Sequence, residues 1–390
     1  MAITKIDSSM LEDVSGADNL VKLDANAKIP AGTGANLLNR PGPFSSASDP
    51  TKTSNKAAGT EWLNTTSGEM YVCTNATTDS NIWTNVGDGS GNVQPWEFQG
   101  TAYGYTSGGH FGSQKDVIDK FSFTSDGNAT DVGNLTFART EGCGHSSATY
   151  GYVSGGRGVP YATLNNSIDK FSFASDANAT DSGDLVATIT QPAGQSSTTH
   201  GYVAGGLGGS AVASVQKFST SSGGNASAIS GVLTSARRGC AGVSSPTYGY
   251  TVGGSGPYSN VIEKMNFSTD ANATDVGDLS IARGSFAGNS STTEGFAGGG
   301  ADAGTPPGAN QIEKWSFASD ANATSHGNLS REAYGVCGQS ATAYGYTSGG
   351  YVPNTYSNII DKYAFTSNTT ATDVGDLSVA RGELPQAQQY

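Results

Sequence analysis

One phrase, glycine-aromatic-x-x-glycine-glycine, recurs six times between residues 103 and 350 and limits the possible folds of this chain more than any other feature. The copies read YGYTSGG, YGYVSGG, HGYVAGG, YGYTVGG, EGFAGGG and YGYTSGG. Their first glycines lie 47, 50, 48, 46 and 50 residues apart. A nearly fixed period with small changes of length indicates a repeated unit whose loops vary on a constant scaffold.

Each period contains the same further pieces. A variable loop follows the double glycine, and then come a segment such as IDKFSF (118–123), a turn such as SDANATD (175–181) and usually Ala-Arg. A small-residue segment such as GCGHSSAT (142–149) leads to the next copy. Turn residues separate these short stretches and no helical period is sustained, so each repeat predicts a sheet of four antiparallel strands. Such a sheet can bury its two faces only against neighbouring sheets. Sheets arranged radially in a closed ring achieve this and leave few exposed strand edges. Six repeats therefore predict that residues 95–390 form a six-bladed β-propeller.

This order of pieces resembles the kelch repeat. The resemblance covers about 295 residues and implies that the double glycine ends the second strand and that the Arg follows the fourth. The sequence departs from the kelch pattern at two points. The fourth strand lacks the usual tryptophan, and the second repeat, ATITQP at 187–192, lacks the Arg.

The segment GELPQAQQY (382–390) matches the innermost strand of a further repeat. No Gly-aromatic strand follows it, whereas the first repeat has one at 103–109. We therefore expect this segment to pair within the first blade, next to WEFQG (96–100), and to lock the ring.

The region before the repeats divides into a polar arm and linker (1–58) and a small β module with a joint (59–94). The segment KLDANAKIPAGTGANLL (22–38) resembles one near the start of many bacteriophage tail-fibre proteins, which implies an attachment arm; the alternative is a disordered arm. The module resembles small β modules of phage tail and fibre proteins. So few residues bury little surface, which favours a homo-oligomer, with a trimer as the expected form.

Composition excludes several classes of partner. With 20 basic and 33 acidic residues the net charge is -13, which disfavours nucleic acid and anionic lipid. No apolar run reaches the ~18 residues of a membrane span, so no membrane insertion is expected. The four cysteines form no CxxC pair and are expected to be free buried thiols of a chain made in a reducing cytoplasm: Cys73, Cys143, Cys240 and Cys337.

Acidic turns between the third and fourth strands place Asp126, Asp176, Asp270 and Asp320 on one face, with Asp131, Asp181, Asp275 and Asp373 nearby. The pattern D-x-N-x-T-D loosely resembles an EF-hand calcium loop but lacks its glycine and its distant glutamate. It also resembles, imperfectly, the structural Asp-box turn of sialidases. Asx-turns bonded to the backbone are the favoured interpretation, with no metal and no cofactor predicted and calcium left as the alternative.

The loops between the second and third strands differ from repeat to repeat and concentrate aromatic residues beside prolines. They are expected to share a face with the connections between blades. Exposed rings on stiffened loops suit stacking on sugars or on protein epitopes. The alternative is that they only pack on neighbouring loops. The predicted binding residues are Phe111, Tyr161, Tyr258, Tyr351 and Tyr356.

Other recurring polar residues are expected to be structural. An Arg and an Asp-Lys or Glu-Lys pair recur at fixed register, which indicates a bridge between blades. The arginines are Arg139, Arg237, Arg283, Arg331 and Arg381. The histidines lack metal-ligand spacing, serines such as Ser146 line the channel, and no GxSxG motif is present, so no catalytic residue is predicted.

These resemblances imply a phage tail fibre or receptor-binding adhesin, assembled in the host cytoplasm and located in the virion tail. Its expected partners are other virion tail proteins, through the N-terminal region, and a host-surface glycan or protein. A structural virion protein of the collar, baseplate or decoration type is the alternative. A sialidase-like glycosidase is less favoured because its arginine cluster and Tyr–Glu pair are absent, as are the copper ligands of a galactose oxidase.

Overall fold

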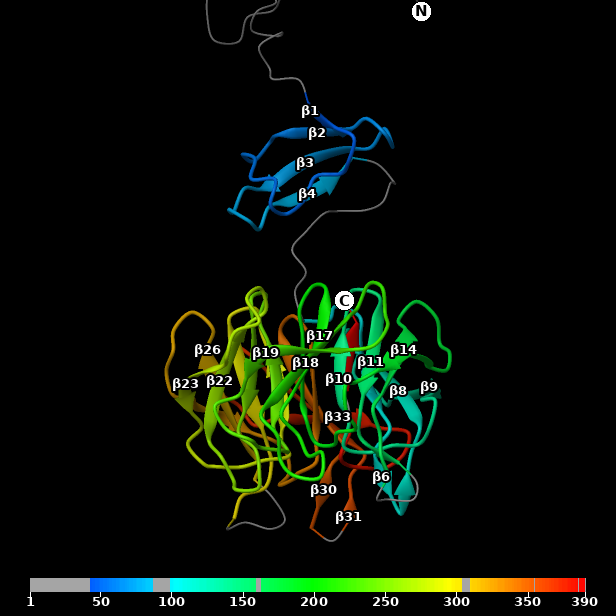
Figure 1. Ribbon diagram of the computed structural model, residues 1–390, viewed down its shortest axis with the longest axis vertical. Helices are drawn as coiled ribbons and strands as arrows, with labels where there is room; N and C mark the ends of the chain where they lie inside the picture. The colour runs from blue at the N-terminus through cyan, green and yellow to red at the C-terminus, as the bar shows by residue number, and fades with distance from the viewer. Residues whose placement is uncertain are drawn as a thin grey trace, which may run out of the picture. The chain divides into compact units, whose positions relative to one another are not determined.

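The computed structural model describes residues 43–86, 99–158, 163–303, 309–353, 355–384 and 386–389. Every regular element in these ranges is a β-strand, which confirms the all-β prediction (Figure 1). The chain divides into two compact units, residues 1–95 and 96–390. A search of the described residues for a helix able to cross a membrane finds none.

The first unit contains one four-stranded sheet in the order β1-β2-β3-β4. Strand β1 is parallel to β2 and the other neighbours are antiparallel. The strands are β1 (Phe44–Ser46), β2 (Glu61–Asn64), β3 (Met70–Asn75) and β4 (Ile82–Asn85). Residues alternate between buried and partly buried along β2 and β3, and the buried side chains form a small core of Trp62, Tyr71, Cys73 and Trp83.

This sheet begins earlier than the sequence predicts, because β1 lies within the segment assigned to the arm and linker. Two indole N–H groups hold that linker against the sheet. Trp62 donates to the carbonyl of Ser48 at 2.9 Å and Trp83 to that of Thr51 at 3.1 Å. The linker residues therefore belong to the small unit. The segment 22–38 lies outside the described residues.

The second unit contains six four-stranded antiparallel sheets, numbered here in chain order. In sheets 2 to 6 the strands are adjacent in the order of the sequence. The strands of sheets 1 to 3 are β34 (Gln386–Gln389), β5 (Tyr103–Ser107), β8 (Val117–Ser122) and β9 (Thr130–Asn134); β10 (Cys143–Ser146), β11 (Tyr150–Ser154), β14 (Ser167–Ser172) and β15 (Thr180–Asp184); and β16 (Ala193–Ser196), β17 (His200–Ala204), β18 (Ser214–Ser219) and β19 (Ser227–Val232).

The remaining sheets follow the same plan. Their strands are β20 (Ala241–Ser244), β21 (Tyr248–Val252), β22 (Val261–Asn266) and β23 (Thr274–Asp278); β24 (Ala287–Ser290), β25 (Glu294–Gly298), β26 (Gln311–Ser316) and β27 (Thr324–Asn328); and β28 (Cys337–Ser340), β29 (Tyr344–Ser348), β32 (Ile359–Ala364) and β33 (Thr372–Asp376). Short two-stranded ribbons occupy three loops between the second and third strands: β6 (His110–Phe111) with β7 (Ser113–Gln114), β12 (Arg157–Gly158) with β13 (Thr163–Leu164), and β30 (Tyr351–Val352) with β31 (Thr355–Tyr356).

The repeated glycines are required by close packing within each sheet. In five of the six copies the first glycine of the phrase lies under an aromatic ring of the third strand, so that a Cβ on Gly104 would lie 2.6 Å from the Phe121 ring. The double glycine at the end of the second strand has positive φ in both residues, as in Gly155 (63°) and Gly156 (96°). Glycine adopts this left-handed conformation at little cost, which explains why the phrase is preserved in the repeats.

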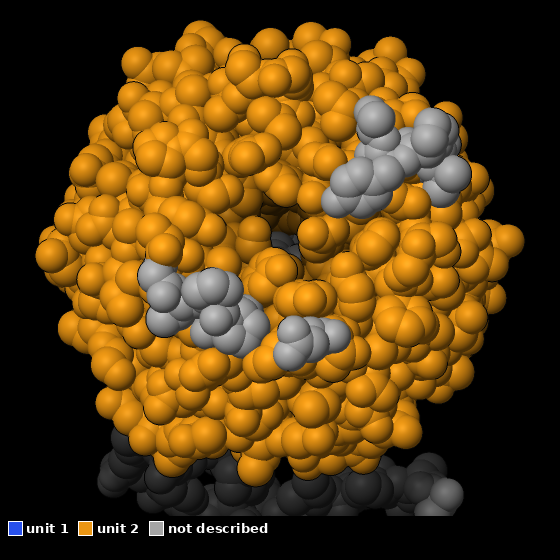
Figure 2. All heavy atoms as spheres, turned by 90° about the horizontal axis from the view of Figure 1, so that it is seen from below, with its two compact units in different colours: residues 1–95 blue, residues 96–390 orange. Residues whose placement is uncertain are grey.

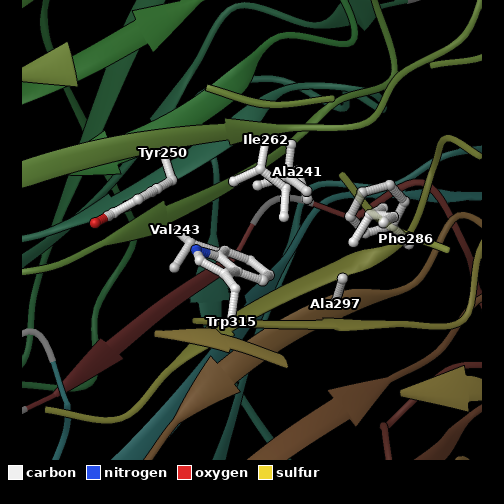
Figure 3. Packing of buried hydrophobic residues seen from close by; sticks show 9 residues of the cluster. Ala241, Val243, Tyr250, Ile262, Phe286, Ala297 and Trp315 are labelled. Carbon is white, nitrogen blue, oxygen red and sulfur yellow. The ribbon is translucent and has the colours of Figure 1, made fainter. Parts of the chain in front are cut away.

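The hydrophobic cores lie between neighbouring sheets. In one cluster, Tyr250 and Ile262 of sheet 4 pack with Ala297 and Trp315 of sheet 5 (Figure 3). The same contact occurs between sheets 6 and 1, where the rings of Tyr346 and Phe123 stack at 4.9 Å. A sheet therefore needs a neighbouring sheet on each side to bury both of its faces.

The chain end completes the first sheet. Strand β34 pairs with β5, with Gln386 opposite Thr106, which confirms the predicted pairing. The innermost strands contact one another in the order β34, β10, β16, β20, β24, β28 and again β34. The expectation that WEFQG lies beside this strand is not met at its described end. Gly100 pairs with Ala341 of sheet 6, and the Gln99 amide donates to the Ser290 carbonyl of sheet 5, because this end enters between other innermost strands.

Candidate functional site

The recurring arginines form ion pairs between neighbouring sheets of the second unit. Each forms an ion pair with the carboxylate on the third strand of the next sheet, at 2.5 to 3.0 Å, and the last pair joins sheets 6 and 1. The prediction that these charges bridge neighbouring sheets is confirmed. The pairs are Arg139–Asp169, Arg237–Glu263, Arg283–Glu313, Arg331–Asp361 and Arg381–Asp119.

Two repeats depart from this pattern. In the fifth, Ala333 occupies the backbone position of Arg139, and Arg331, two residues earlier, reaches the equivalent carboxylate. In the second, Ile189 replaces the arginine and Gln216 replaces its acid, and the Gln216 amide oxygen still accepts the N–H of Val186. A buried carboxylate without a partner is costly, so the loss of both charges together is physically consistent.

The acidic turns are also structural. The first aspartate of the turn pairs with the lysine on the third strand of the preceding sheet, in Lys120–Asp176, Lys217–Asp270, Lys264–Asp320 and Lys362–Asp126. The second aspartate accepts the N–H of the glycine two residues later, as Asp275 does from Gly277 at 3.2 Å. The Asx-turn prediction is therefore confirmed for the second set, while the first set binds lysine rather than the backbone.

Serines of the innermost strands join the sheets along the axis. The Ser146 N–H donates to the Ser196 hydroxyl at 3.0 Å, and the Ser290 N–H donates to that of Ser340 at 2.9 Å. His145, fully buried nearby, contacts the Gln195 carbonyl, and burial lowers its pKa from 6.5 to about 4. These polar groups form contacts between neighbouring sheets.

The variable loops lie beside the connections between sheets, as the sequence predicts. A bridge joins Thr140 of one connection to Arg157 at the start of a loop, and Tyr334 pairs with Tyr351 in the same way. Figure 2 shows this face of the second unit, here called the loop face, with a hollow at its centre.

Three of the predicted aromatic residues form one cluster on this face. The Tyr356 ring lies 5.8 Å from that of Phe111 and 5.2 Å from that of Tyr351, and its hydroxyl contacts His110 at 2.7 Å. Tyr334, which the sequence analysis missed, extends the cluster, because its ring lies 5.2 Å from Tyr351. Tyr351 and Tyr356 thus pack largely on neighbours.

The remaining predicted residues differ in exposure and position. Phe111 is 47% exposed and Tyr258 39% exposed. Tyr258 interacts electrostatically with Tyr334, whose pKa is raised by burial first and then by Tyr351, Glu383 and Tyr258. Tyr161 lies outside the described residues.

A cycle of backbone hydrogen bonds surrounds the axis at the loop face. In each repeat, the residue two positions beyond the arginine site donates its N–H to the carbonyl of the equivalent residue in the preceding repeat, at 2.6 to 3.0 Å. The first of these, Glu141, donates to the last, Glu383, at 3.0 Å. All have φ between 56° and 63°: Glu141, Gln191, Gly239, Ser285, Gly335 and Glu383. This set, here called the axial cycle, was not found from the sequence, because its members share a position but not a residue type.

A recess of about 110 Å³ lies at the axial cycle. Its walls include the apolar side chains of Phe286, Val336 and Leu384, and Tyr334 contributes an aromatic wall. Three thiols also line it, and all four cysteines are free and buried, as predicted: Cys73, Cys143, Cys240 and Cys337.

Two carboxyl groups line the recess and differ in their contacts. Glu141 is paired with Arg157 at 2.6 Å and accepts from Thr190 and Gln191. Glu383 accepts one bond, from the Thr140 hydroxyl, at 3.1 Å. Burial, followed by the charge of Glu141, raises the pKa of Glu383 to about 7. A carboxyl group with a pKa in this range changes its charge near neutral pH.

No known protein family matches this sequence, and no curated protein matches it.

Proposed function

We propose that residues 95–390 form a six-bladed kelch-like β-propeller that recognises a receptor through its loop face. Three observations support the closed ring. Ion pairs, stacked rings and turn contacts between consecutive sheets recur between the sixth sheet and the first. The innermost strands contact one another in cyclic order. The axial cycle returns from Glu383 to Glu141.

The protein is, on this proposal, a receptor-binding adhesin of a bacteriophage tail, assembled in the host cytoplasm, whose receptor is a host-surface glycan or protein. One observation carries this function: five of the six turns opposite the loop face are similar and are held by bonds within the turn and to the preceding sheet, whereas the loops vary and expose aromatic rings. Exposed aromatic residues on a rigid scaffold are typical of recognition surfaces. The net charge of -13 favours a receptor that is not strongly anionic.

Binding without catalysis is the second part of the proposal. The arginines of the repeats, which a sialidase-like glycosidase would need at its active site, are buried in ion pairs between sheets. Two of the four described histidines, His145 and His326, are buried and contact backbone carbonyls of the next sheet. These contacts favour a scaffold over an enzyme.

Attachment to other tail proteins is assigned to the N-terminal region. The described part of the first unit has a core of four buried side chains, three of them aromatic, and Phe44 and Val86 on its surface are 44% and 57% exposed. A unit so small gains stability from association. We propose a homo-oligomer, with a trimer as the first form to test.

The alternative is a structural virion protein of the collar, baseplate or decoration type. The exposed Phe111 and Tyr258 would then be covered by other subunits. Antibodies against the loop face distinguish the two, because they bind intact particles only if that face is accessible.

The direct test measures binding of the labelled full chain to host cells. Tyr258→Ala on the loop face is compared with Tyr344→Ala on the opposite face, since both rings are 39% exposed. We expect Tyr258→Ala to weaken binding by about tenfold, the effect of losing a stacked ring, and Tyr344→Ala to leave it unchanged. Absence of cell binding by the unaltered chain, or equal effects of both variants, would reject the adhesin.

A further inference from the structure

The recess at the centre of the loop face is an open space inside the axial cycle, lined by residues whose contacts join the sheets. It lies where the connections from all the sheets converge, so the variable loops surround its mouth. Figure 2 shows the hollow at this place. A ligand that contacts several loops at once would therefore lie over the recess.

We propose that this recess binds the hydroxyl-bearing edge of one uncharged sugar ring, with Tyr334 as its aromatic wall and Glu383 as its hydrogen-bond acceptor. The inference rests on the proposed function, because it names the class of receptor that the loop face recognises.

The size of the recess favours one part of a sugar. Its volume is about 110 Å³. A cavity of ~150 Å³ is enough to hold benzene, so this recess is too small for an entire pyranose ring. One edge of the ring enters, and the remainder lies on the rim among the loops.

The walls match the two kinds of surface that a sugar presents. Phe286, Val336 and Leu384 exclude water from the sides of the recess and suit the C–H groups of the ring. Tyr334 is half-buried, and its ring is held at 5.2 Å from that of Tyr351. A fixed aromatic face of this kind packs on the apolar face of a pyranose with little loss of side-chain freedom.

The carboxyl groups supply acceptors for hydroxyl donors. Glu141 is held by Arg157, Thr190 and Gln191 and so has a fixed orientation. Glu383 accepts from Thr140 through Oε2. A carboxylate has about four acceptor positions, so Glu383 retains capacity for sugar hydroxyls.

The charge balance selects an uncharged ring over both charged alternatives. The net charge of -13 disfavours a uronic or sialic acid. Arg157 already neutralises Glu141, and Glu383 is only partly ionised near its pKa of about 7, so an ammonium group gains little.

The test measures binding of single sugars to the full chain by ligand-observed NMR and calorimetry. The uncharged probes are glucose, galactose and N-acetylglucosamine, and the charged probes are glucuronic acid, sialic acid and glucosamine. We expect millimolar binding of at least one uncharged sugar and binding about tenfold weaker for each charged probe. Absence of binding by all uncharged sugars, or equal binding of charged ones, would overturn the proposal.

Variants locate the site. Tyr334→Ala removes the aromatic wall, and Ser285→Gln fills the recess with a side chain that Gln191 already carries at an equivalent left-handed position. Each should weaken sugar binding about tenfold, whereas Tyr344→Ala should not. Unchanged binding in both recess variants, with melting temperatures preserved, would place the sugar elsewhere and refute the inference.

The two proposals fail in different ways. If the chain binds host cells but sugars do not bind the recess, the adhesin stands and the recess inference falls. If sugars bind the recess but the chain does not bind host cells, the recess inference stands and the adhesin falls.

Discussion

The two faces of the second unit differ in what surrounds their loops. On the face formed by the acidic turns, the turns contact the preceding sheet: an asparagine of the turn accepts a backbone N–H, as Asn178 does from Asn134, and in four turns the first aspartate binds a lysine. On the loop face, Phe111 and Tyr258 extend to solvent. The comparison indicates that a turn is uniform where a neighbouring sheet requires each of its groups, and varies where no neighbour does.

The exceptions on the turn face support this interpretation. The last turn, SNTTATD, has no aspartate at the position that receives a lysine. Lys314, which would bind there, pairs instead with Glu294 of its own sheet. A change in one turn is thus matched by a change in its neighbour's contacts.

The strongest test of this coupling removes one charge from the ion pair that joins sheets 6 and 1. Arg381→Ile leaves Asp119 buried and unpaired, and we expect a loss of about 3–5 kcal/mol in the free energy of unfolding. The double variant Arg381→Ile with Asp119→Gln copies the Ile189 and Gln216 arrangement and should recover most of that loss. Chemical denaturation of both variants measures the difference; equal losses would contradict the coupling.

Glycine substitutions compare the two faces directly. A Cβ on Gly183, beside the acidic turns, would lie 2.5 Å from the backbone carbonyl of Gly224 in the next sheet. We expect Gly183→Ala to cost about 2–3 kcal/mol, since backbone must move. Gly112 on the loop face has φ of 65° and open space around it, so Gly112→Ala should cost about 1 kcal/mol from conformation alone. Thermal melting ranks the two; the reverse order would refute the argument.

The pH dependence of the free energy of unfolding tests the environment of Glu383 on the loop face. The pKa of Glu383 is raised from 4.5 to about 7 in the folded chain. The fold therefore favours the protonated form, and this contribution to stability is complete below pH 4.5 and lost as pH rises through about 7. Relative to Glu383→Gln, the unaltered chain should lose about 2–3 kcal/mol between these values. Parallel stability curves for the two proteins would contradict the assignment.

The smallest effect is expected for an exposed ion pair of the acidic turns. Asp320 is 57% exposed in its pair with Lys264. We expect Asp320→Ala to cost about 0.2–1 kcal/mol, and less at high salt, because water screens such pairs. Denaturation at low and high salt measures it. A loss as large as that of Arg381→Ile would remove the distinction between the buried and exposed pairs.

Much of the fold was predictable because the repeat carries its own physical reasons. A glycine under an aromatic ring, a double glycine with positive φ and an arginine facing a carboxylate each leave a residue-type signal at fixed spacing. The pairing of the last segment with the first sheet followed from the same register. Strand β1 was missed because Phe44–Ser46 lies among Pro and Ser residues that are typical of a linker.

The candidate site was predictable only in part. Phe111, Tyr351 and Tyr356 were found because aromatic residues stand out in variable loops. The axial cycle and the carboxyl groups of the recess were missed, because Glu141, Gly239 and Ser285 share only a backbone conformation and a position relative to the arginine. Arg331 was placed in the correct role, but its offset of two residues shows that a side chain can reach the same carboxylate from another backbone site.

The pairing of β34 with β5 has a consequence for biosynthesis. The edge of β5 that receives β34 has no partner until the far end of the repeat region leaves the ribosome. An exposed strand edge of this kind can recruit a strand from a second nascent chain. The speed of translation over the last repeat should therefore affect how many chains fold as monomers and how many exchange strands with a second chain. Chaperones that cover β5 should have the same kind of effect.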